Sequence, residues 1–203
     1  MATMWGRGLL IAFYGPSGVG KSKQMDLLME RLKEERVQTK KVVYPIIELG
    51  ESGKKIKKLV YRKEPPLPEE EMQKLFTQNR LEFEPTLRKW LDSGVTVLAE
   101  DYVGTGMVWG VTRGITLERM EEINSDYTPA DVSILIDGPR RLDLRPGEGH
   151  IYQSDEEEWY RARKVYLQMA DKYGWIRVGG DAPILTVAGR IWTVVKLALT
   201  MKK

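Results

Sequence analysis

Cysteine is absent from the 203-residue sequence, and histidine occurs once, as His150. Without cysteine the chain has no disulfide, no thiolate metal ligand and no thiol redox chemistry. A single histidine excludes a cluster of histidine metal ligands and argues against a Ser-His-Asp triad. The absence of cysteine also fits a protein of the reducing cytoplasm, so we expect a cytoplasmic location.

The sequence also has no long apolar run near its start. Residues 1–8 contain no apolar segment followed by a cleavage site, and residues 9–14 are too few for a signal peptide or a membrane span. We therefore expect no membrane partner. With 42% apolar and 30% charged residues, residues 1–203 can form one α/β domain with a full core. The net charge of +3 is compatible with nucleotide binding but equally with ordinary surface lysines.

Short apolar runs alternate with stretches of helical periodicity along the chain. The first run, residues 9–14, is typical of a strand buried on both faces, and a helix is predicted directly after the glycine-rich turn that follows it. This alternation predicts an α/β fold with a five-stranded parallel sheet flanked by helices. The predicted strands are residues 9–14, 41–44, 95–99, 132–136 and 175–178, and the predicted helices are residues 21–35, 52–61, 69–91, 117–124, 155–173 and 183–199.

Polar residues that follow the predicted strands are the first candidates for a site. In parallel sheets of this kind, ligands bind beyond the carboxyl ends of the strands. Gly15, Glu100 and Asp137 occupy such positions. Residues 140–154 are polar and contain arginine and glycine, which predicts a lid loop able to close over a bound ligand.

The segment from Gly15 to Ser22 matches the phosphate-binding pattern G-x-x-x-x-G-K-[ST] without a gap. Its glycines let successive backbone N–H groups point at phosphate oxygens, and the following helix adds the positive end of its dipole. Lys21 supplies charge to the β and γ phosphates of ATP, and the Ser22 hydroxyl is a natural Mg²⁺ ligand. An ordinary glycine-rich turn is the alternative, but the segment lies between a buried strand and a helix, as the motif requires. The residues predicted to bind ATP are Gly15, Pro16, Ser17, Gly18, Val19, Gly20, Lys21 and Ser22.

A P-loop alone does not distinguish kinases from GTPases and motor ATPases. GTPases usually carry an N/T-K-x-D motif that reads the base, and this sequence has none. Large ATPase machines need a longer chain. Small size and an arginine-bearing lid therefore favour a nucleotide kinase with a P-loop nucleoside-triphosphate hydrolase-type fold.

Longer motifs resemble the thymidylate kinase family over nearly the whole chain. Residues 75–82, Leu-Phe-Thr-Gln-Asn-Arg-Leu-Glu, resemble the family's L-F-x-x-N-R-x-E, and residues 100–114 are similar to its D-R-Y-x-x-S-x-x-A-Y-x-x-x-R-G. Less specific likenesses are residues 44–45 followed by residues 52–54, and Ala130-Asp131 before a strand. The resemblance implies ATP, Mg²⁺, phosphoryl transfer to dTMP and a homodimer.

The same resemblance implies an acceptor site. Phe76 would stack on the acceptor base and Arg80 would hydrogen-bond its edge, while Tyr102, Thr105 and Trp109 would form the walls of the pocket. An aromatic face beside a forked donor combines stacking with polar selection at low entropic cost. The alternative is that Phe76 belongs to the core and Arg80 to a solvated helix face.

The sequence departs from the family where the acceptor phosphate would bind. Glu100-Asp101 replaces the family's Asp-Arg, Ile47 replaces an arginine that follows the proline, and Ser17 replaces an acidic P-loop residue. Glu100 can still serve as a Mg²⁺ ligand. A carboxylate at Asp101, in contrast, would repel a bound monophosphate. The candidate replacement cations are Arg62 and Arg113.

Three functions remain open on these residues. The leading one is ATP-dependent phosphoryl transfer to a pyrimidine deoxynucleotide, dTMP or a close relative. If the acceptor is a hydroxyl of a nucleoside, a modified nucleotide or, less favoured, a nucleic acid, Asp101 could act as general base. Asp101 could equally be a solvated strand-end residue or a salt-bridge partner. The third function is nucleotide binding without turnover.

Arginines of the lid are candidates for stabilising the transferring phosphoryl group. Gly18 stands where some thymidylate kinases have a P-loop arginine, so the lid is expected to supply this charge, with Arg145 as first candidate and Arg141 as second. The predicted catalytic residues are thus Lys21, Asp101, Arg145 and Arg141, and the predicted metal ligands are Ser22 and Glu100.

Overall fold

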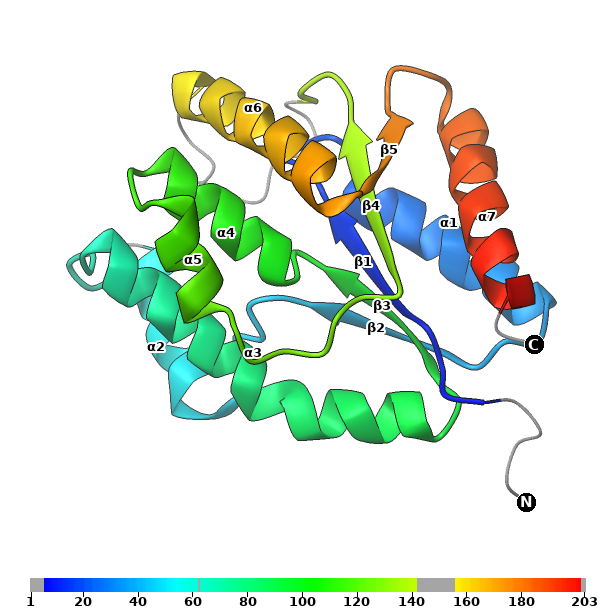
Figure 1. The fold of residues 1–203 in the computed structure, drawn as a ribbon, viewed down its shortest axis with the longest axis horizontal. Coiled ribbons are helices and arrows are strands. Elements are labelled where there is room, and N and C mark those ends of the chain that lie inside the picture. The colour runs from blue at the N-terminus through cyan, green and yellow to red at the C-terminus, as the bar shows by residue number, and fades with distance from the viewer. Residues whose placement is uncertain (1–5, 62, 142–155, 202–203) are drawn as a thin grey trace.

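The computed structural model describes residues 6–61, 63–141 and 156–201. Its centre is a parallel five-stranded sheet with the strand order β2-β3-β1-β4-β5 (Figure 1). This confirms the predicted α/β fold and parallel sheet. The strands are β1 (Leu10–Tyr14), β2 (Thr39–Val43), β3 (Thr96–Glu100), β4 (Val132–Asp137) and β5 (Ile176–Gly179).

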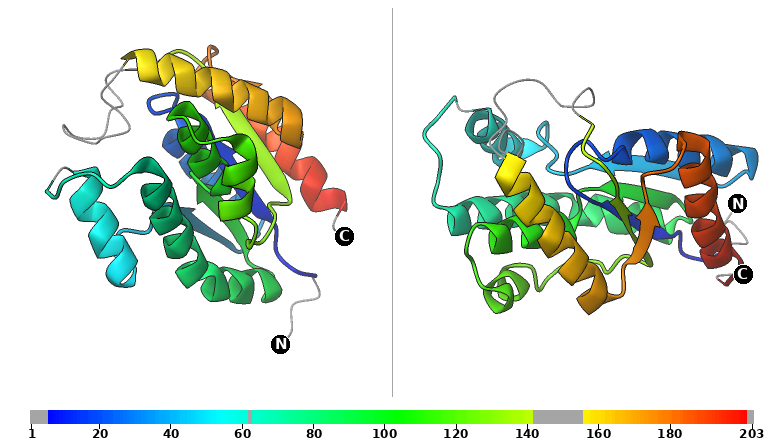
Figure 2. Two further views of the ribbon diagram at one scale, coloured as in Figure 1. Left: turned by 60° about the vertical axis from the view of Figure 1, so that its left-hand side comes forward. Right: turned by 90° about the horizontal axis from the view of Figure 1, so that it is seen from above.

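Helices cover both faces of the sheet (Figures 1 and 2). The helices α1 and α7 lie together on one face, and the remaining helices lie on the other. The helices are α1 (Lys21–Glu34), α2 (Gly50–Val60), α3 (Glu69–Asp92), α4 (Val103–Thr112), α5 (Leu117–Ile123), α6 (Glu156–Tyr173) and α7 (Ile184–Met201).

The central strand β1 explains why two helical layers form. Leu10, Ala12 and Tyr14 point into the core beneath α2 to α6, whereas Ile11 and Phe13 point into the core beneath α1 and α7. Because side chains alternate along a strand, a continuous apolar run presents apolar groups to both layers. All five residues of β1 are buried.

The strand register brings the candidate residues together. Phe13 pairs with Glu100 of β3, and Tyr14 pairs with Leu135 of β4. The carboxyl ends of β1, β3 and β4 therefore lie at one edge of the sheet. The turn after β1, which begins at Gly15, faces the residues that follow Glu100.

Helix α4 is not marked by amphipathic periodicity. Its sequence is apolar on nearly every side and contains Gly104, Gly106 and Gly110. These glycines allow close packing: a Cβ on Gly104 would lie 2.6 Å from the Trp175 ring, and one on Gly110 would lie 2.3 Å from the sulfur of Met120. Helix α4 is thus held by its neighbours rather than by intrinsic helix propensity.

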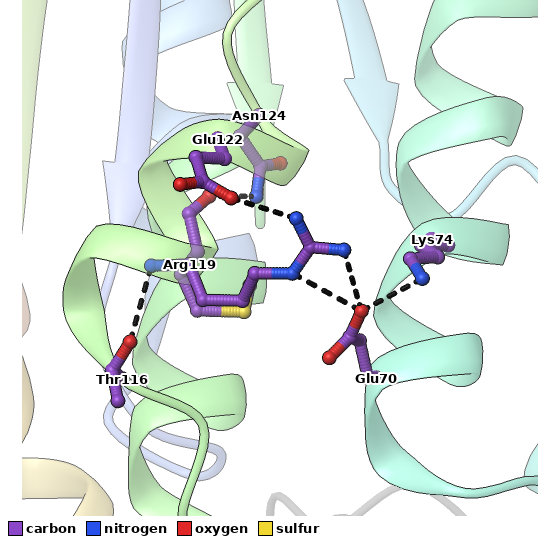
Figure 3. Close-up of polar contacts among 7 residues, drawn as sticks. Glu70, Lys74, Thr116, Arg119, Glu122 and Asn124 are labelled. Carbon is purple, nitrogen blue, oxygen red and sulfur yellow. Dashed lines mark hydrogen bonds and ion pairs between the residues drawn. The ribbon is translucent and has the colours of Figure 1, made fainter.

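Helix α5 is tied to α3 by a surface ion-pair network (Figure 3). The Arg119 guanidinium donates to Glu70 Oε1 through Nη2 at 2.6 Å and Nε at 3.1 Å, and Nη1 donates to Glu122 at 2.7 Å. This network holds the end of α5, and its C-cap residue Asn124, against α3.

Helix α7 is long and apolar enough to cross a membrane by length and composition alone. Val187, Ile191 and Val195 form a stripe on this helix that packs into the core shared with α1. The spacing of this stripe, i, i+4 and i+8, is that of a helix covering a sheet.

Candidate active site

The loop between β1 and α1 folds on glycines with positive φ. Gly15, Gly18 and Gly20 have φ values of 136°, 82° and 93°, which residues with side chains rarely adopt. A Cβ on Gly15 would also lie 2.5 Å from the carbonyl oxygen of Ile136. Gly20 is the N-cap of α1 and has no side chain to cap the first N–H groups. These N–H groups are therefore available to an anion.

Lys21 is held at the centre of this loop. Its side chain is buried, and Nζ donates to the carbonyl oxygens of Gly15 at 2.8 Å and Pro16 at 3.4 Å. Nζ also forms an ion pair with Asp101 Oδ1 at 3.5 Å. The loop thus fixes the ammonium group beside the carboxylate that follows β3.

Ser22 and Glu100 form a hard-oxygen pair next to this lysine. Ser22 Oγ donates to Glu100 Oε1 at 2.7 Å. Burial, and then the charge of Asp101, raise the pKa of Glu100, while Lys21 and the Ser22 hydroxyl oppose the shift. Mg²⁺ is usually bound by one or two such oxygens together with substrate phosphates and water, and the hydroxyl and carboxylate fit that role. Within the described ranges, no cluster of three His, Asp or Glu side chains could hold a metal by itself.

Asp101 has an unusual backbone conformation. Its φ is +55°, in the left-handed region that costs most residues with a Cβ about 1–2 kcal/mol but is more readily visited by Asp and Asn. Thr105 Oγ1 donates to Asp101 Oδ1 at 3.1 Å, and Tyr166 donates to Thr105 Oγ1 at 3.2 Å. The side chain is 28% exposed. Strained residues of this kind are enriched at functional sites.

One cavity of about 540 Å³ joins the P-loop to helices α3 and α4. This size is in the range of sites for small molecules. The P-loop residues Gly15 and Lys21 line one part, together with Glu100 and Asp101. The residues predicted to bind the acceptor that line the same cavity are Phe76, Arg80, Thr105 and Trp109.

Arg80 is buried in the cavity wall rather than exposed on a helix face. Its Nη2 donates to Thr77 Oγ1 at 2.9 Å and Asn124 Oδ1 at 2.6 Å. The Asn124 amide is oriented in turn by a bond from Nδ2 to the carbonyl oxygen of Met120 at 2.8 Å (Figure 3). Burial lowers the pKa of Arg80 to about 10, so the guanidinium is still charged at neutral pH.

Tyr102 does not line this cavity, which corrects the expectation that it forms a pocket wall. The side chain is 1% exposed, and its hydroxyl donates to the carbonyl oxygen of Thr128 at 3.0 Å. Its ring packs against Tyr44 with centroids 5.3 Å apart. Tyr102 is the N-cap of α4 and has extended backbone dihedrals. Its side chain therefore does not share the helical face of Thr105 and Trp109.

Arg113, a candidate cation for the acceptor phosphate, is engaged elsewhere. Its Nε and Nη2 donate to the two carboxylate oxygens of Glu158 at 2.8 and 3.2 Å, and Nη1 donates to Glu69 at 3.1 Å. Arg113 does not line the cavity. Arg113 forms ion pairs with two carboxylates, one on each helix, and so joins α3 to α6. The other candidate, Arg62, lies outside the described residues.

The start of the predicted lid contacts the P-loop through its backbone. The N–H of Arg141 donates to the carbonyl oxygen of Gly18 at 3.0 Å. From α6, Trp159 Nε1 donates to the carbonyl oxygen of Ser17 at 2.7 Å. The remaining lid candidate, Arg145, lies outside the described residues.

Asp137, which the sequence indicated as a polar residue at the end of a strand, forms a bidentate ion pair with Arg163 at 2.6 and 2.9 Å.

Several residues that line the cavity were not predicted from the sequence. Gln73, Lys41 and Tyr166 all contribute to its wall. Helical spacing offered a signal for Gln73, because it precedes Phe76 by three positions and Arg80 by seven. Lys41 carried no local signal, since its role depends on the pairing of β2 with β3.

Comparison with known proteins gives a consistent result. The family model "Thymidylate kinase" matches residues 13–191. Protein 251L of Invertebrate iridescent virus 6, a relative named after thymidylate kinase, is 28% identical over 94% of this chain and 89% of its own. The thymidylate kinase of Thermomicrobium roseum is 29% identical over 91% of this chain and 93% of its own.

Among solved structures, the thymidylate kinase of Candida albicans superposes with a TM-score of 0.75 over 94% of this chain and 92% of its own, at 20% identity. That structural likeness concerns the fold. The family match covers most of the chain, including the P-loop, the cavity and the residues after β3. The chain therefore belongs to the thymidylate kinase family and is a nucleotide kinase.

Proposed function

We propose that the protein transfers the γ-phosphoryl group of ATP to dTMP in the presence of Mg²⁺. This proposal rests on one observation: the same cavity is lined by Lys21 of the P-loop and by Phe76, Arg80 and Trp109. A donor and an acceptor bound in one such space are held in position for direct transfer. Family membership supports the same reaction.

On the donor side, backbone N–H groups from Gly15 to Ser22 would bind the β and γ phosphates. Lys21 would lie against the γ phosphate, where charge develops during transfer. Ser22 and Glu100 would hold Mg²⁺, which neutralises phosphate charge when bound. Arg141 and Arg145 keep their proposed roles as lid cations that stabilise the transferring group.

On the acceptor side, the base would lie against the half-buried ring of Phe76, with Trp109 as a second apolar wall. Arg80 is fixed by Thr77 and Asn124, so its guanidinium is pre-organised to donate to a carbonyl oxygen on the base edge. Thymine offers such oxygens.

The acceptor phosphate needs a cation, because Asp101 and Ile47 replace the family's arginines. Lys41 lines the cavity, and its side chain is 23% exposed. Its Nζ forms an ion pair with Asp26 on α1 at 2.8 Å. The charge of Lys41 also acts to lower the pKa of Glu100, one of the two residues proposed to hold Mg²⁺. We assign to Lys41 the neutralisation of the acceptor phosphate.

A second candidate function rests on Asp101. Its carboxylate lines the cavity beside Lys21 and accepts a hydrogen bond from Thr105. A carboxylate in this place could accept the proton of an attacking hydroxyl. The acceptor would then be a nucleoside, with phosphate transferred to its 5′-oxygen.

Steady-state kinetics with dTMP, thymidine, other nucleosides and single-stranded DNA as acceptors separate these functions. Phosphorylation of dTMP to dTDP, with thymidine at least about 100-fold poorer in kcat/KM, is the result we expect. Turnover with thymidine alone supports the hydroxyl-acceptor reaction. ATP binding without turnover of any acceptor leaves a nucleotide-binding protein and rejects both kinase reactions.

Assembly and location are proposed on the family resemblance. We propose a homodimer in the cytoplasm, formed from one domain over residues 1–203, with no membrane partner. Nucleic acid is a less favoured partner than a nucleoside or nucleotide. Sedimentation-equilibrium analysis of the purified protein tests the oligomeric state, because a monomeric mass at micromolar concentration contradicts the dimer.

A further inference from the structure

A buried amide oxygen in the cavity wall has no partner in the part of the chain that the structure describes. Gln73 lies on α3, its side chain is fully buried, and it lines the cavity. Its Oε1 accepts no hydrogen bond from the described residues. Buried carbonyl oxygens are nearly always hydrogen-bonded, so such an oxygen at a cavity is an expected contact point for a ligand.

The orientation of this amide is fixed by its neighbours. Gln73 Nε2 donates to Glu69 Oε1 at 2.6 Å, and Glu69 Oε2 accepts from Arg113 Nη1 at 3.1 Å. Because a carboxylate paired with an arginine only accepts hydrogen bonds, the amide nitrogen must be the atom that faces Glu69. The amide oxygen therefore lies on the side away from Glu69. A flip of the amide would place this oxygen against the Glu69 carboxylate, so the oxygen stays in place as an acceptor.

The oxygen and the Arg80 guanidinium converge on Gly106 of α4. A Cβ on Gly106 would lie 3.1 Å from Gln73 Oε1 and 3.3 Å from each terminal nitrogen of Arg80. An acceptor and a donor therefore both lie close to Gly106, which has no side chain to separate them from the cavity. All three residues line the cavity, together with Phe76.

A pyrimidine 2,4-dione, the ring of thymine and uracil, presents the complementary pattern. Its N3–H donor stands between two carbonyl oxygens, so one edge offers a donor next to an acceptor. Arg80 can only donate and Gln73 Oε1 can only accept. Cytosine has a lone pair at N3 in place of the N–H, and in the same pose that lone pair would face the oxygen.

We infer that Gln73 is a specificity-determining residue whose Oε1 accepts a hydrogen bond from the N3–H of a pyrimidine 2,4-dione. This inference rests on the proposed function, which supplies a thymine nucleotide as acceptor. Glu69 and Arg113 act as positioning residues, because they hold the Gln73 amide with its oxygen toward the cavity.

The test compares the affinity of dTMP with that of its N3-methyl derivative, which has no donor at N3. Isothermal titration calorimetry would measure both nucleotides against the wild-type protein, Gln73→Ala and Gln78→Ala. Gln78 is an exposed glutamine on the same helix and serves as the matched control. ATP affinity, measured in parallel, reports whether each variant keeps its fold.

Wild-type protein and Gln78→Ala should bind dTMP about 10- to 100-fold more tightly than the N3-methyl derivative. Gln73→Ala removes the acceptor and leaves room for the methyl group, so the two nucleotides should bind within about threefold of each other. Equal affinities in the wild-type protein overturn the inference without any substitution. Discrimination that persists in Gln73→Ala overturns it as well.

Failure of the proposed function gives a different result. If dTMP is phosphorylated but N3-methylation has no effect, only the role of Gln73 is rejected. If the wild-type protein neither binds nor phosphorylates dTMP, the proposed function and the role of Gln73 are rejected together.

Discussion

The ammonium group of Lys21 lies 3.5 Å from Asp101 Oδ1, so the cation of the P-loop is paired with the carboxylate that follows β3. Both residues line the cavity that also contains Phe76 and Arg80. A triphosphate at the P-loop would compete with Asp101 for this ammonium group. Binding of ATP would therefore change the electrostatic environment of the acceptor through Lys21 and Asp101.

Lys21→Ala should abolish most phosphoryl transfer. The substitution removes a buried charge that we propose lies against the γ phosphate, and losses of about 100- to 1,000-fold in kcat follow from removal of one such donor. Initial rates of ADP formation with dTMP measure the effect. Lys33→Ala, an exposed lysine on the same helix, should keep wild-type kinetics. Equal rates for wild type and Lys21→Ala contradict the assignment of the site.

Asp101→Asn should distinguish the two acceptors. Asparagine tolerates positive φ as well as aspartate does, so the backbone at Asp101 should be preserved. Removing the negative charge should leave kcat/KM for dTMP unchanged or higher, because repulsion of the acceptor phosphate is relieved. A loss of about 100-fold or more with any acceptor assigns Asp101 as general base for that acceptor.

Lys41→Met should weaken binding of dTMP but not of thymidine. Lys41 is the proposed cation for the acceptor phosphate, and loss of a charged contact should raise KM for dTMP by about 10-fold. Thymidine lacks the phosphate, so its dissociation constant should be unchanged. Lys40→Met is the control, because Lys40 lies on the opposite face of β2 over the Trp90 ring. Equal weakening of both ligands by Lys41→Met would show a general structural effect instead.

Gly106→Ala should narrow the acceptor part of the cavity. The added methyl group would lie 3.1 Å from Gln73 Oε1 and 3.3 Å from the Arg80 guanidinium nitrogens, so these side chains must shift. We expect KM for dTMP to rise by about 10-fold while KM for ATP stays the same. Gly189→Ala on α7, where a Cβ meets nothing within 4 Å, should leave both unchanged. Unchanged dTMP kinetics in Gly106→Ala would place the base elsewhere.

The network of Figure 3 should make thermal stability depend on pH. Hydrogen bonds from Arg119 and Lys74 lower the pKa of Glu70 from 4.5 to about 2. A carboxyl whose pKa is lower in the folded state stabilises the fold fully above its unfolded pKa, and this contribution is lost as pH falls toward the folded value.

The Tm difference between wild type and Glu70→Gln should therefore be constant above about pH 5.5 and shrink from there to pH 3. Because the pair is exposed, the difference should be small and should fall further in 1 M NaCl. Differential scanning calorimetry across this range measures it. A difference that grows on acidification contradicts the assigned role of Glu70.

Local sequence signals predicted the strands and the P-loop. An apolar run that ends at Gly15 marks a buried strand, and Lys21-Ser22 has a fixed spacing from it. Glu100 could be placed near Ser22 because it ends β3 and Ser22 comes after β1, and a parallel sheet aligns the carboxyl ends of these two strands. These inferences needed only periodicity and the general location of sites in parallel sheets.

Contacts between distant segments could not be predicted in this way. Tyr102 turns into the core because Asp101 adopts a positive φ just before α4 begins, and no local pattern marks that turn. Arg113 meets Glu69 and Glu158 only because α3 and α6 both pack near the end of α4. The sequence could show that these residues are charged, but pairing depends on how the helices pack.

The most direct test of the central claim is a crystal structure with a bisubstrate ligand, adenosine and thymidine joined through their 5′-positions by a chain of phosphates. We expect phosphates against the backbone N–H groups from Gly15 to Ser22 and the Lys21 ammonium group. We expect the thymine ring against Phe76 and within hydrogen-bond distance of Arg80. A phosphate chain away from the P-loop, or a thymine ring outside the cavity that Phe76 and Arg80 line, would contradict it.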